Sequence, residues 1–155
     1  MNKVRYFVNQ FRSAIELAKE FGEFKKDISF NSFPRGCCGD TSDLLAHYLL
    51  ENGIKTYYVC GTYRADKFED TQSHAWLIML DGTIIDITGD QFKDDSRFLK
   101  YDKSVYIGEM DSFHTLFEVE PRDVRESVRL ESLGAMSQAR MKGLYKTIIE
   151  YIENN

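Results

Sequence analysis

Two adjacent cysteines are the residues of this 155-residue chain best suited to covalent chemistry. Cys37 and Cys38 stand between glycines in the segment Gly-Cys-Cys-Gly-Asp (36–40), where a predicted helix begins. A thiol is a strong nucleophile only as a thiolate, and its pKa falls at a helix N-terminus beside an imidazole. The pattern therefore favours a nucleophilic cysteine. The alternative is a pair of ordinary buried thiols, because free cysteine is among the most buried residue types.

Three histidines could act as the base that takes the thiol proton. His47 lies in the same predicted helix, well past its start, so we expect it not to reach Cys38. His114 has no acidic partner placed by an obvious turn. His74 differs because it opens a predicted strand, and the adjoining predicted strand carries Asp86 inside a run of isoleucines. His74 is therefore the predicted base.

Asp86 is the predicted partner of that base. A carboxylate among isoleucines costs free energy unless it is hydrogen-bonded or paired. A histidine on the neighbouring strand would satisfy it, and the carboxylate would fix the imidazole tautomer in return. The alternative is a carboxylate that faces water from a half-exposed sheet. The predicted catalytic triad is Cys38, His74 and Asp86.

The turn between the two strands decides whether His74 and Asp86 share a face of the sheet. A two-residue turn of Asp81 and Gly82 would put them on opposite faces. A turn one residue longer, with Gly82 in the left-handed region, places Asp86 opposite Trp76 and one diagonal step from His74. A wider turn or a bulge would also serve. The sequence thus permits a register that puts the two side chains on one face, and it does not decide among these turns.

The spacing of apolar residues outlines the elements that must position these groups. Helices are predicted for a first segment that ends near Gly22, for about Cys38 to Asn52, and for 136–152. Strands are predicted at 54–63, 74–80, 83–88, 104–107 and 115–119, with 89–103 as loop. The polar stretch 64–73 is either a substrate-binding lid or a solvated loop. This order of elements indicates one α+β domain over residues 1–155.

Three short segments together resemble the transglutaminase-like superfamily. In that superfamily a nucleophilic cysteine begins a helix, an aspartate follows two places later, and a Gly-Ile pair ends the helix before a strand. Residues 36–54 have this pattern, and the strand-like run 57–63 follows. His-Ala-Trp-Leu (74–77) resembles the superfamily's His-Ala-Trp-Val strand, and Ile-Asp-Ile-Thr (85–88) resembles its Asp-x-Thr motif. The resemblance covers roughly residues 36–88.

The resemblance implies a papain-like fold, in which a central helix bearing the nucleophile packs on an antiparallel sheet. It also implies a Cys-His-Asp triad, and counting back from Gly53 to the superfamily's nucleophile selects Cys38 over Cys37. The second cysteine and the short connection from His74 to Asp86 depart from the superfamily pattern. Every triad member is nevertheless present.

The triad predicts a cysteine hydrolase, a peptidase or amidase, that opens an amide or isopeptide bond through an acyl-enzyme intermediate. We expect the backbone N–H of Cys38 to stabilise the oxyanion, because it lies at the helix start. The candidates for a second oxyanion donor or for the cleft wall are Asn31, Ser32, Cys37, Gln72 and Gln91. Alternatives of the same fold are an acyltransferase or transglutaminase and a protein-glutamine deamidase. An inactive protein-binding module is the alternative from another class.

Composition argues against several other kinds of protein. The formal net charge is −5 and the basic residues are scattered among acids, which disfavours a nucleic-acid partner, so we expect a protein or peptide substrate. No apolar run approaches the ~18 residues that span a bilayer, and the N-terminus lacks the features of a signal peptide. Three cysteines make no disulfide framework, so we expect reduced thiols and a cytoplasmic protein. Adjacent cysteines are also not the usual Cys-x-x-Cys chelate, so no metal or other cofactor is expected.

Overall fold

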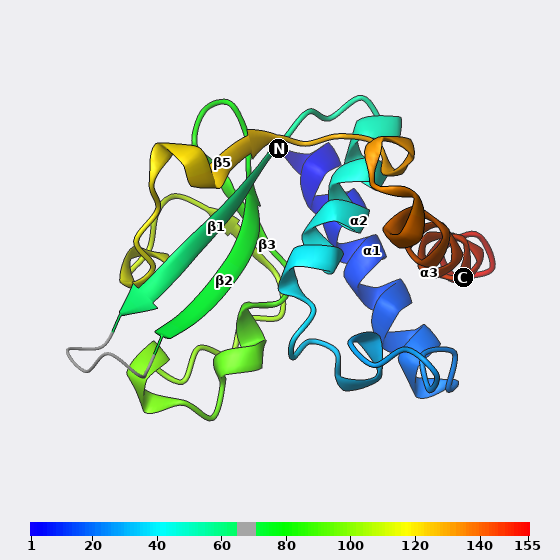
Figure 1. Ribbon diagram of the computed structural model, residues 1–155, viewed down its shortest axis with the longest axis horizontal. Coiled ribbons are helices and arrows are strands. Elements are labelled where there is room, and N and C mark those ends of the chain that lie inside the picture. The colour runs from blue at the N-terminus through cyan, green and yellow to red at the C-terminus, as the bar shows by residue number, and fades with distance from the viewer. Residues whose placement is uncertain (65–70) are drawn as a thin grey trace.

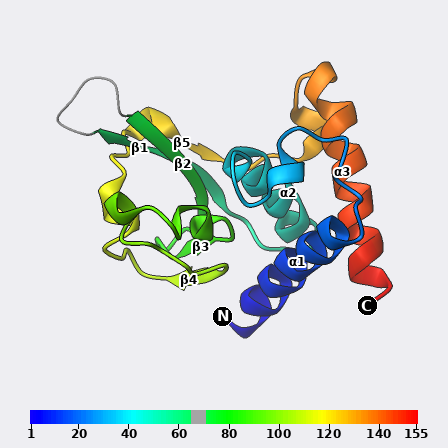
Figure 2. The same ribbon diagram turned by 90° about the horizontal axis from the view of Figure 1, so that it is seen from below.

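The computed structural model describes residues 1–64 and 71–155, and these form an α+β fold. The helices are α1 (Asn2–Glu20), α2 (Cys38–Glu51) and α3 (Ala135–Glu153). The strands are β1 (Tyr57–Arg64), β2 (Thr71–Ile78), β3 (Ile84–Asp86), β4 (Tyr106–Gly108) and β5 (Val124–Glu126). They form an antiparallel sheet in the order β4-β3-β2-β1-β5, and the three helices lie together on one side of it (Figures 1 and 2).

The three predicted helices are confirmed. Helix α1 buries one stripe of side chains, which includes Val8, Phe11 and Ile15, at the helical spacing of three and four residues. Helix α2 begins at Cys38, as predicted. It ends before Gly53, whose φ of 76° lies in the left-handed region that glycine adopts without strain. Within the described residues no helix is both long and apolar enough to cross a membrane.

The hairpin between β2 and β3 has the predicted register. Leu77 pairs with Ile85, and the backbone N–H of Met79 donates to the carbonyl of Thr83 at 2.9 Å. Three residues therefore form the turn, and the last of them, Gly82, has φ 87°. This register leaves Asp86 opposite Trp76, on the same face of the sheet as His74. The geometric condition for the predicted pair is met.

Strand β2 begins earlier than predicted. It starts at Thr71 and pairs with the end of β1, where Thr71 lies opposite Arg64. The predicted lid or loop at 64–73 is therefore strand at both ends, and its remaining residues, 65–70, lie outside the described residues. Gln72 belongs to a strand and not to a loop.

The prediction of a strand at 115–119 is wrong. A short 3-10 helix, His114–Leu116, occupies this region, and among the described residues it is joined to the sheet by the isolated bridge of Thr62 with Glu118. The physical reason is Asp111, whose side chain accepts the backbone N–H of His114 at 2.8 Å and starts a helical turn. The sheet instead gains β5, which the sequence pattern did not predict.

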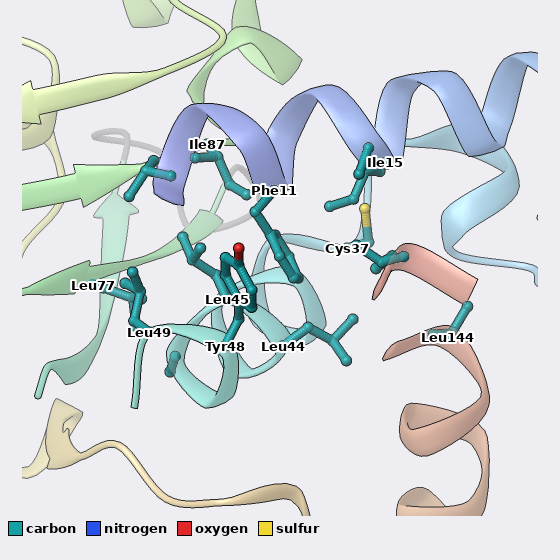
Figure 3. Close-up of a cluster of buried hydrophobic side chains, with 14 of the residues drawn as sticks. Phe11, Ile15, Cys37, Leu44, Leu45, Tyr48, Leu49, Leu77, Ile87 and Leu144 are labelled. Carbon is teal, nitrogen blue, oxygen red and sulfur yellow. The ribbon is translucent and has the colours of Figure 1, made fainter. Parts of the chain in front are cut away.

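Two clusters of buried apolar side chains lie on the two faces of the sheet, because neighbouring strand residues point to opposite sides. The helical-side cluster, which contains Phe11, Leu45 and Leu77, fills the space between helices and sheet (Figure 3). The loop-side cluster is mainly aromatic, and the segment between β3 and β5 covers it on the other side of the molecule (Figure 2). Its buried members are Val59, Trp76, Ile84, Phe92, Phe98, Tyr101, Phe113 and Phe117.

Candidate active site

Cys38 lies at the N-terminus of α2 and reaches strand β2. Its sulfur interacts with the His74 imidazole and with the backbone N–H of Ala75. Burial by itself raises the pKa of this thiol, but the hydrogen bond and positive charge of His74 outweigh it and the pKa of Cys38 is lowered. The N-terminal end of a helix favours a thiolate for the same electrostatic reason. The geometry therefore suits an activated nucleophile.

Cys37, the preceding residue, has the opposite environment. Its side chain is 2% exposed and belongs to the helical-side cluster, where its sulfur points toward Ile15 (Figure 3). Burial raises the pKa of the Cys37 thiol to about 12. Its thiol therefore lies in the core. The interpretation of Cys37 as an oxyanion donor or cleft residue beside Cys38 is wrong.

His74 is fully buried on β2 and joins the thiol to the carboxylate. Its Nε2 lies 2.7 Å from Oδ2 of Asp86, so Nδ1 is the nitrogen that Cys38 and the side-chain amide of Gln91 share. Burial lowers the pKa of an imidazole, but the charge and hydrogen bond of Asp86, with Cys38, raise the pKa of His74 to about 9. The raised pKa of the imidazole and the lowered pKa of the thiol together favour a thiolate–imidazolium pair.

Asp86 ends strand β3 and is only 2% exposed. Its Oδ1 accepts the backbone N–H of Thr88 at 2.9 Å, and its Oδ2 faces the ring nitrogens of His74 and His114. Burial by itself raises the pKa of this carboxyl, yet the two histidines outweigh it and the pKa of Asp86 is lowered. The alternative of a carboxylate facing water is wrong.

His114 was expected to lack an acidic partner, and this expectation is wrong. Its Nε2 lies 2.8 Å from Oδ2 of Asp86 and its Nδ1 lies 2.7 Å from Oδ1 of Asp111. The ring is fully buried, with Trp76 and Tyr106 packed against it at centroid distances of 5.0 and 5.4 Å. The spacing from Asp111 to His114, three residues, is a local capping signal that could have revealed one of the two contacts. His47 lies elsewhere, beside Glu51 and the backbone N–H of Leu130.

Gln91 is the amide closest to the predicted triad. It belongs to the 3-10 helix Gly89–Phe92, and its Nε2 lies 3.1 Å from Nδ1 of His74, where the amide donates to the neutral imidazole; when Nδ1 carries a proton, the amide presents Oε1 to it instead. The buried Arg12 of α1 holds this helix, because its guanidinium donates to the Ile87 carbonyl at 2.6 Å and to both carboxylate oxygens of Asp90. Gln91 is thus fixed at the mouth of the site, next to the atom that would move a proton.

The other cleft candidates lie farther from the pair. Asn31 and Ser32 are exposed in the 3-10 helix Phe30–Ser32, and Gln72 donates to the carbonyl of Ser73 at 3.3 Å. Within the described part of the chain, none of these three side chains hydrogen-bonds to Cys38, His74 or Asp86. A pocket of about 400 Å³ does bring Ser32 and Gln91 together. Its lining residues are Lys19, Ser32, Phe33, Pro34, Arg35, Asp90, Gln91 and Lys93.

One group in the described residues could bring three metal-ligand atoms together, namely His74, Asp86 and His114, with those atoms within 4.8 Å of one another. All three side chains are fully buried, and both ring nitrogens lie at hydrogen-bond distance from the same carboxylate oxygen. Protons on the nitrogens account for these contacts without an ion. We therefore describe the group as a hydrogen-bonded set.

Comparison with known proteins supplies no relative. A scan against models of protein families and searches of curated proteins and of solved structures found no match for this chain. The function must therefore be argued from the site. That site consists of a thiol with a lowered pKa at a helix start, a buried imidazole beside it, and a buried carboxylate behind the imidazole.

Proposed function

We propose that this chain is a cysteine hydrolase of the peptidase or amidase type, which opens an amide or isopeptide bond through an acyl-enzyme on Cys38. One observation carries the proposal: Cys38, His74 and Asp86 are in contact in series, with the pKa of the thiol lowered and that of the imidazole raised. This is the arrangement that activates a nucleophile and orients its base.

The reaction follows from the protonation states of the pair. The Cys38 thiolate attacks the carbonyl carbon of the substrate, the C–N bond breaks, and His74 gives its Nδ1 proton to the departing amine. The product is a thioester on Cys38 and a neutral imidazole. A water molecule then loses a proton to Nδ1 and attacks the thioester, which releases the acid and restores the ion pair. Asp86 holds Nε2–H throughout, so Nδ1 remains the nitrogen that exchanges the proton.

Two donors are proposed for the oxyanion. The backbone N–H of Cys38 lies at the start of α2, where amide hydrogens have no helical partner. The side-chain amide of Gln91, 3.1 Å from Nδ1 of His74, is the second. Gln91 also lines the 400 Å³ pocket, so we propose that a protein or peptide substrate enters from that side.

The broader assignment belongs to the same proposal. The α+β fold, with the nucleophile at the start of a helix packed against an antiparallel sheet, is compatible with a papain-like arrangement and with the transglutaminase-like resemblance. All three cysteines are free thiols, and a reactive one persists in a reducing compartment. We therefore propose a cytoplasmic enzyme.

The proposal is tested by alkylation with iodoacetamide as a function of pH, read for each cysteine by mass spectrometry. A Cys37→Ala background prevents confusion between neighbouring thiols. We expect Cys38 to react with a midpoint well below the ordinary thiol pKa of ~8.5, and His74→Ala to remove this reactivity. Cys60, whose pKa is raised by burial, is the internal reference. Equal, slow labelling of Cys38 and Cys60 before and after the His74 change would contradict the proposal.

A second measurement separates the hydrolase from the alternatives that share its chemistry. Peptide libraries that contain amide and isopeptide bonds are incubated with the protein and with Cys38→Ala. Cleavage that depends on Cys38 supports the hydrolase. Ammonia release from glutamine without cleavage would replace it with a deamidase, and transfer to an added amine would replace it with an acyltransferase. Reactivity of Cys38 without any turnover would favour a binding module.

A further inference from the structure

A second layer of charged groups lies behind the proposed triad. We infer that His114 and Asp111 are positioning residues, which keep the Asp86 carboxylate ionised and directed at His74 and thereby keep Cys38 a thiolate. The inference rests on the proposed function, since it concerns the same site. It is argued from three hydrogen bonds, which join His74 to Asp86, Asp86 to His114, and His114 to Asp111.

The hydrogen bonds of Asp111 define its own charge. Oδ1 accepts the backbone N–H of His114 at 2.8 Å and lies 2.7 Å from the Nδ1 of the same ring, and Oδ2 accepts the hydroxyl of Tyr101 at 3.3 Å. Both oxygens therefore act as acceptors, which is the role of an ionised carboxylate. It follows that Nδ1 of His114 carries a proton and donates it.

The hydrogen bonds of Asp86 define the other side of the ring. Oδ1 of Asp86 accepts from Thr88, and Oδ2 accepts from Nε2 of His74. Nε2 of His114, 2.8 Å from the same Oδ2, must then also donate. An imidazole that donates from both nitrogens is a cation. Cys38, His74, Asp86, His114 and Asp111 thus alternate in charge, with the thiolate first.

The titratable groups that face His114 are Asp86, Asp111, His74, Tyr101 and Tyr106. One further charge lies behind the two phenols, because the ammonium of Lys103 is 5.8 and 5.0 Å from the ring centroids of Tyr101 and Tyr106. Burial and the charge of Asp111 raise the pKa of both phenols, so they are neutral at working pH. The rings of Trp76 and Phe113 complete the enclosure, at 5.0 and 4.9 Å from the imidazole centroid.

Loss of the His114 cation raises the pKa of the Cys38 thiol, whether or not Asp86 stays ionised. If Asp86 stays ionised, the site loses one positive charge and the pKa of Cys38 rises. If Asp86 instead takes a proton, it no longer stabilises the His74 imidazolium, and the pKa of Cys38 rises again. The rise of the Cys38 alkylation rate with pH, which we call the acid limb of the profile, therefore moves to higher pH.

The test is the pH profile of Cys38 alkylation in His114→Gln, His114→Phe and Asp111→Asn. We expect His114→Phe, which has no donor, to move the acid limb upward by about one pH unit or more. His114→Gln can still donate one N–H to Asp86, so it should restore part of the shift. Asp111→Asn should move the limb in the same direction by less, because the imidazole remains and loses only its second carboxylate.

Phe98→Leu is the matched control, because Phe98 is fully buried in the same cluster and stacks on Phe117 without touching the charged series. It should lower the melting temperature and leave the acid limb unchanged. Equal shifts in Phe98→Leu and His114→Phe, or no shift in any His114 variant, would overturn the inference while Cys38 of the unmodified protein keeps its low midpoint. If the unmodified protein itself lacks a low midpoint, the proposed function fails first. Stoichiometric zinc retained after chelator dialysis and lost in His114→Gln would also overturn it, in favour of a metal site.

Discussion

The two faces of the sheet bury their side chains in different ways. The helical-side cluster is apolar, and a polar neighbour such as His47 is paired at its margin with Glu51, whose side chain is 44% exposed. The loop-side cluster instead surrounds His74, Asp86 and His114, each at most 2% exposed. One face is a packing core, and the other holds charge away from water.

Two neighbouring buried thiols therefore have pKa shifts of opposite sign. Cys37 has apolar neighbours, so loss of water raises the pKa of its thiol to about 12. Cys38, one residue later, contacts an imidazole, and its pKa is lowered although burial acts against it. Desolvation favours the neutral form of both thiols, and a partner that stabilises the charged form outweighs it only at Cys38. Partners, and not depth, distinguish the reactive thiol from the inert one.

The largest effect that would sharpen this contrast is expected from Phe11→Ala on the helical side. Phe11 of α1 is fully buried, and its ring stacks on that of Tyr48 with the two centroids 5.2 Å apart. Truncation should lower the free energy of unfolding by about 3–5 kcal/mol in urea titrations, because it removes a phenyl ring and leaves a cavity. The midpoint of Cys38 alkylation should stay where it is. A shift of that midpoint in the folded variant would show that the two faces are not separate.

The next effect concerns stability against pH, measured in a Cys38→Ala background so that the thiolate does not contribute. In this background the Asp86 carboxylate still raises the pKa of His74, so the stabilisation from His74 is fully present below ~6.5 and is lost as pH rises above that value. The pKa of Asp86 is lowered, so its stabilisation is present above ~3.9 and is lost on acidification below that. We expect maximal stability between these limits and a loss of about 1–3 kcal/mol on the alkaline side.

The matched variant for that measurement is His74→Gln in the same background. It removes the group that titrates, so the alkaline loss above pH ~6.5 should disappear from its urea titrations. An unchanged alkaline loss in His74→Gln would assign the effect to another group and would remove the distinction between the two faces.

The sequence predicted those features that depend on local periodicity. The three helices follow from apolar spacing, and the observed register of the hairpin is the one that the three-residue turn gives among those that the sequence permitted. Strand β5 was missed because Val124–Glu126 has one apolar residue followed by two charged ones, which is not a strand pattern. Short edge strands depend on pairing with a neighbour, here β1, which no local signal reports.

The second layer of the site was missed for a different reason. His114 and Asp86 are 28 residues apart, and the chain between them contains 3-10 turns whose direction the residue pattern does not fix. Only the local half of the arrangement, Asp111 three residues before His114, was visible as a capping signal. Long-range hydrogen bonds between loop residues require the tertiary fold, which the apolar pattern gives only for helices and strands.

The smallest effect concerns the start of α2, at the border between the two faces. There the environments of Cys37 and Cys38 can be compared by replacing one sulfur atom with oxygen. Cys37→Ser buries a hydroxyl in the helical-side cluster, beside the Thr41 side chain, and should cost about 1–2 kcal/mol in urea titrations. Cys38→Ser should cost less than Cys37→Ser, because the His74 ring and the N–H of Ala75 can bond the new hydroxyl. Cys37→Ala, which adds no polar atom, separates the hydroxyl effect from lost volume. An equal loss of unfolding free energy in the two serine variants would mean that the neighbouring thiols share one environment. The contrast between the two faces would then not extend to Cys37 and Cys38.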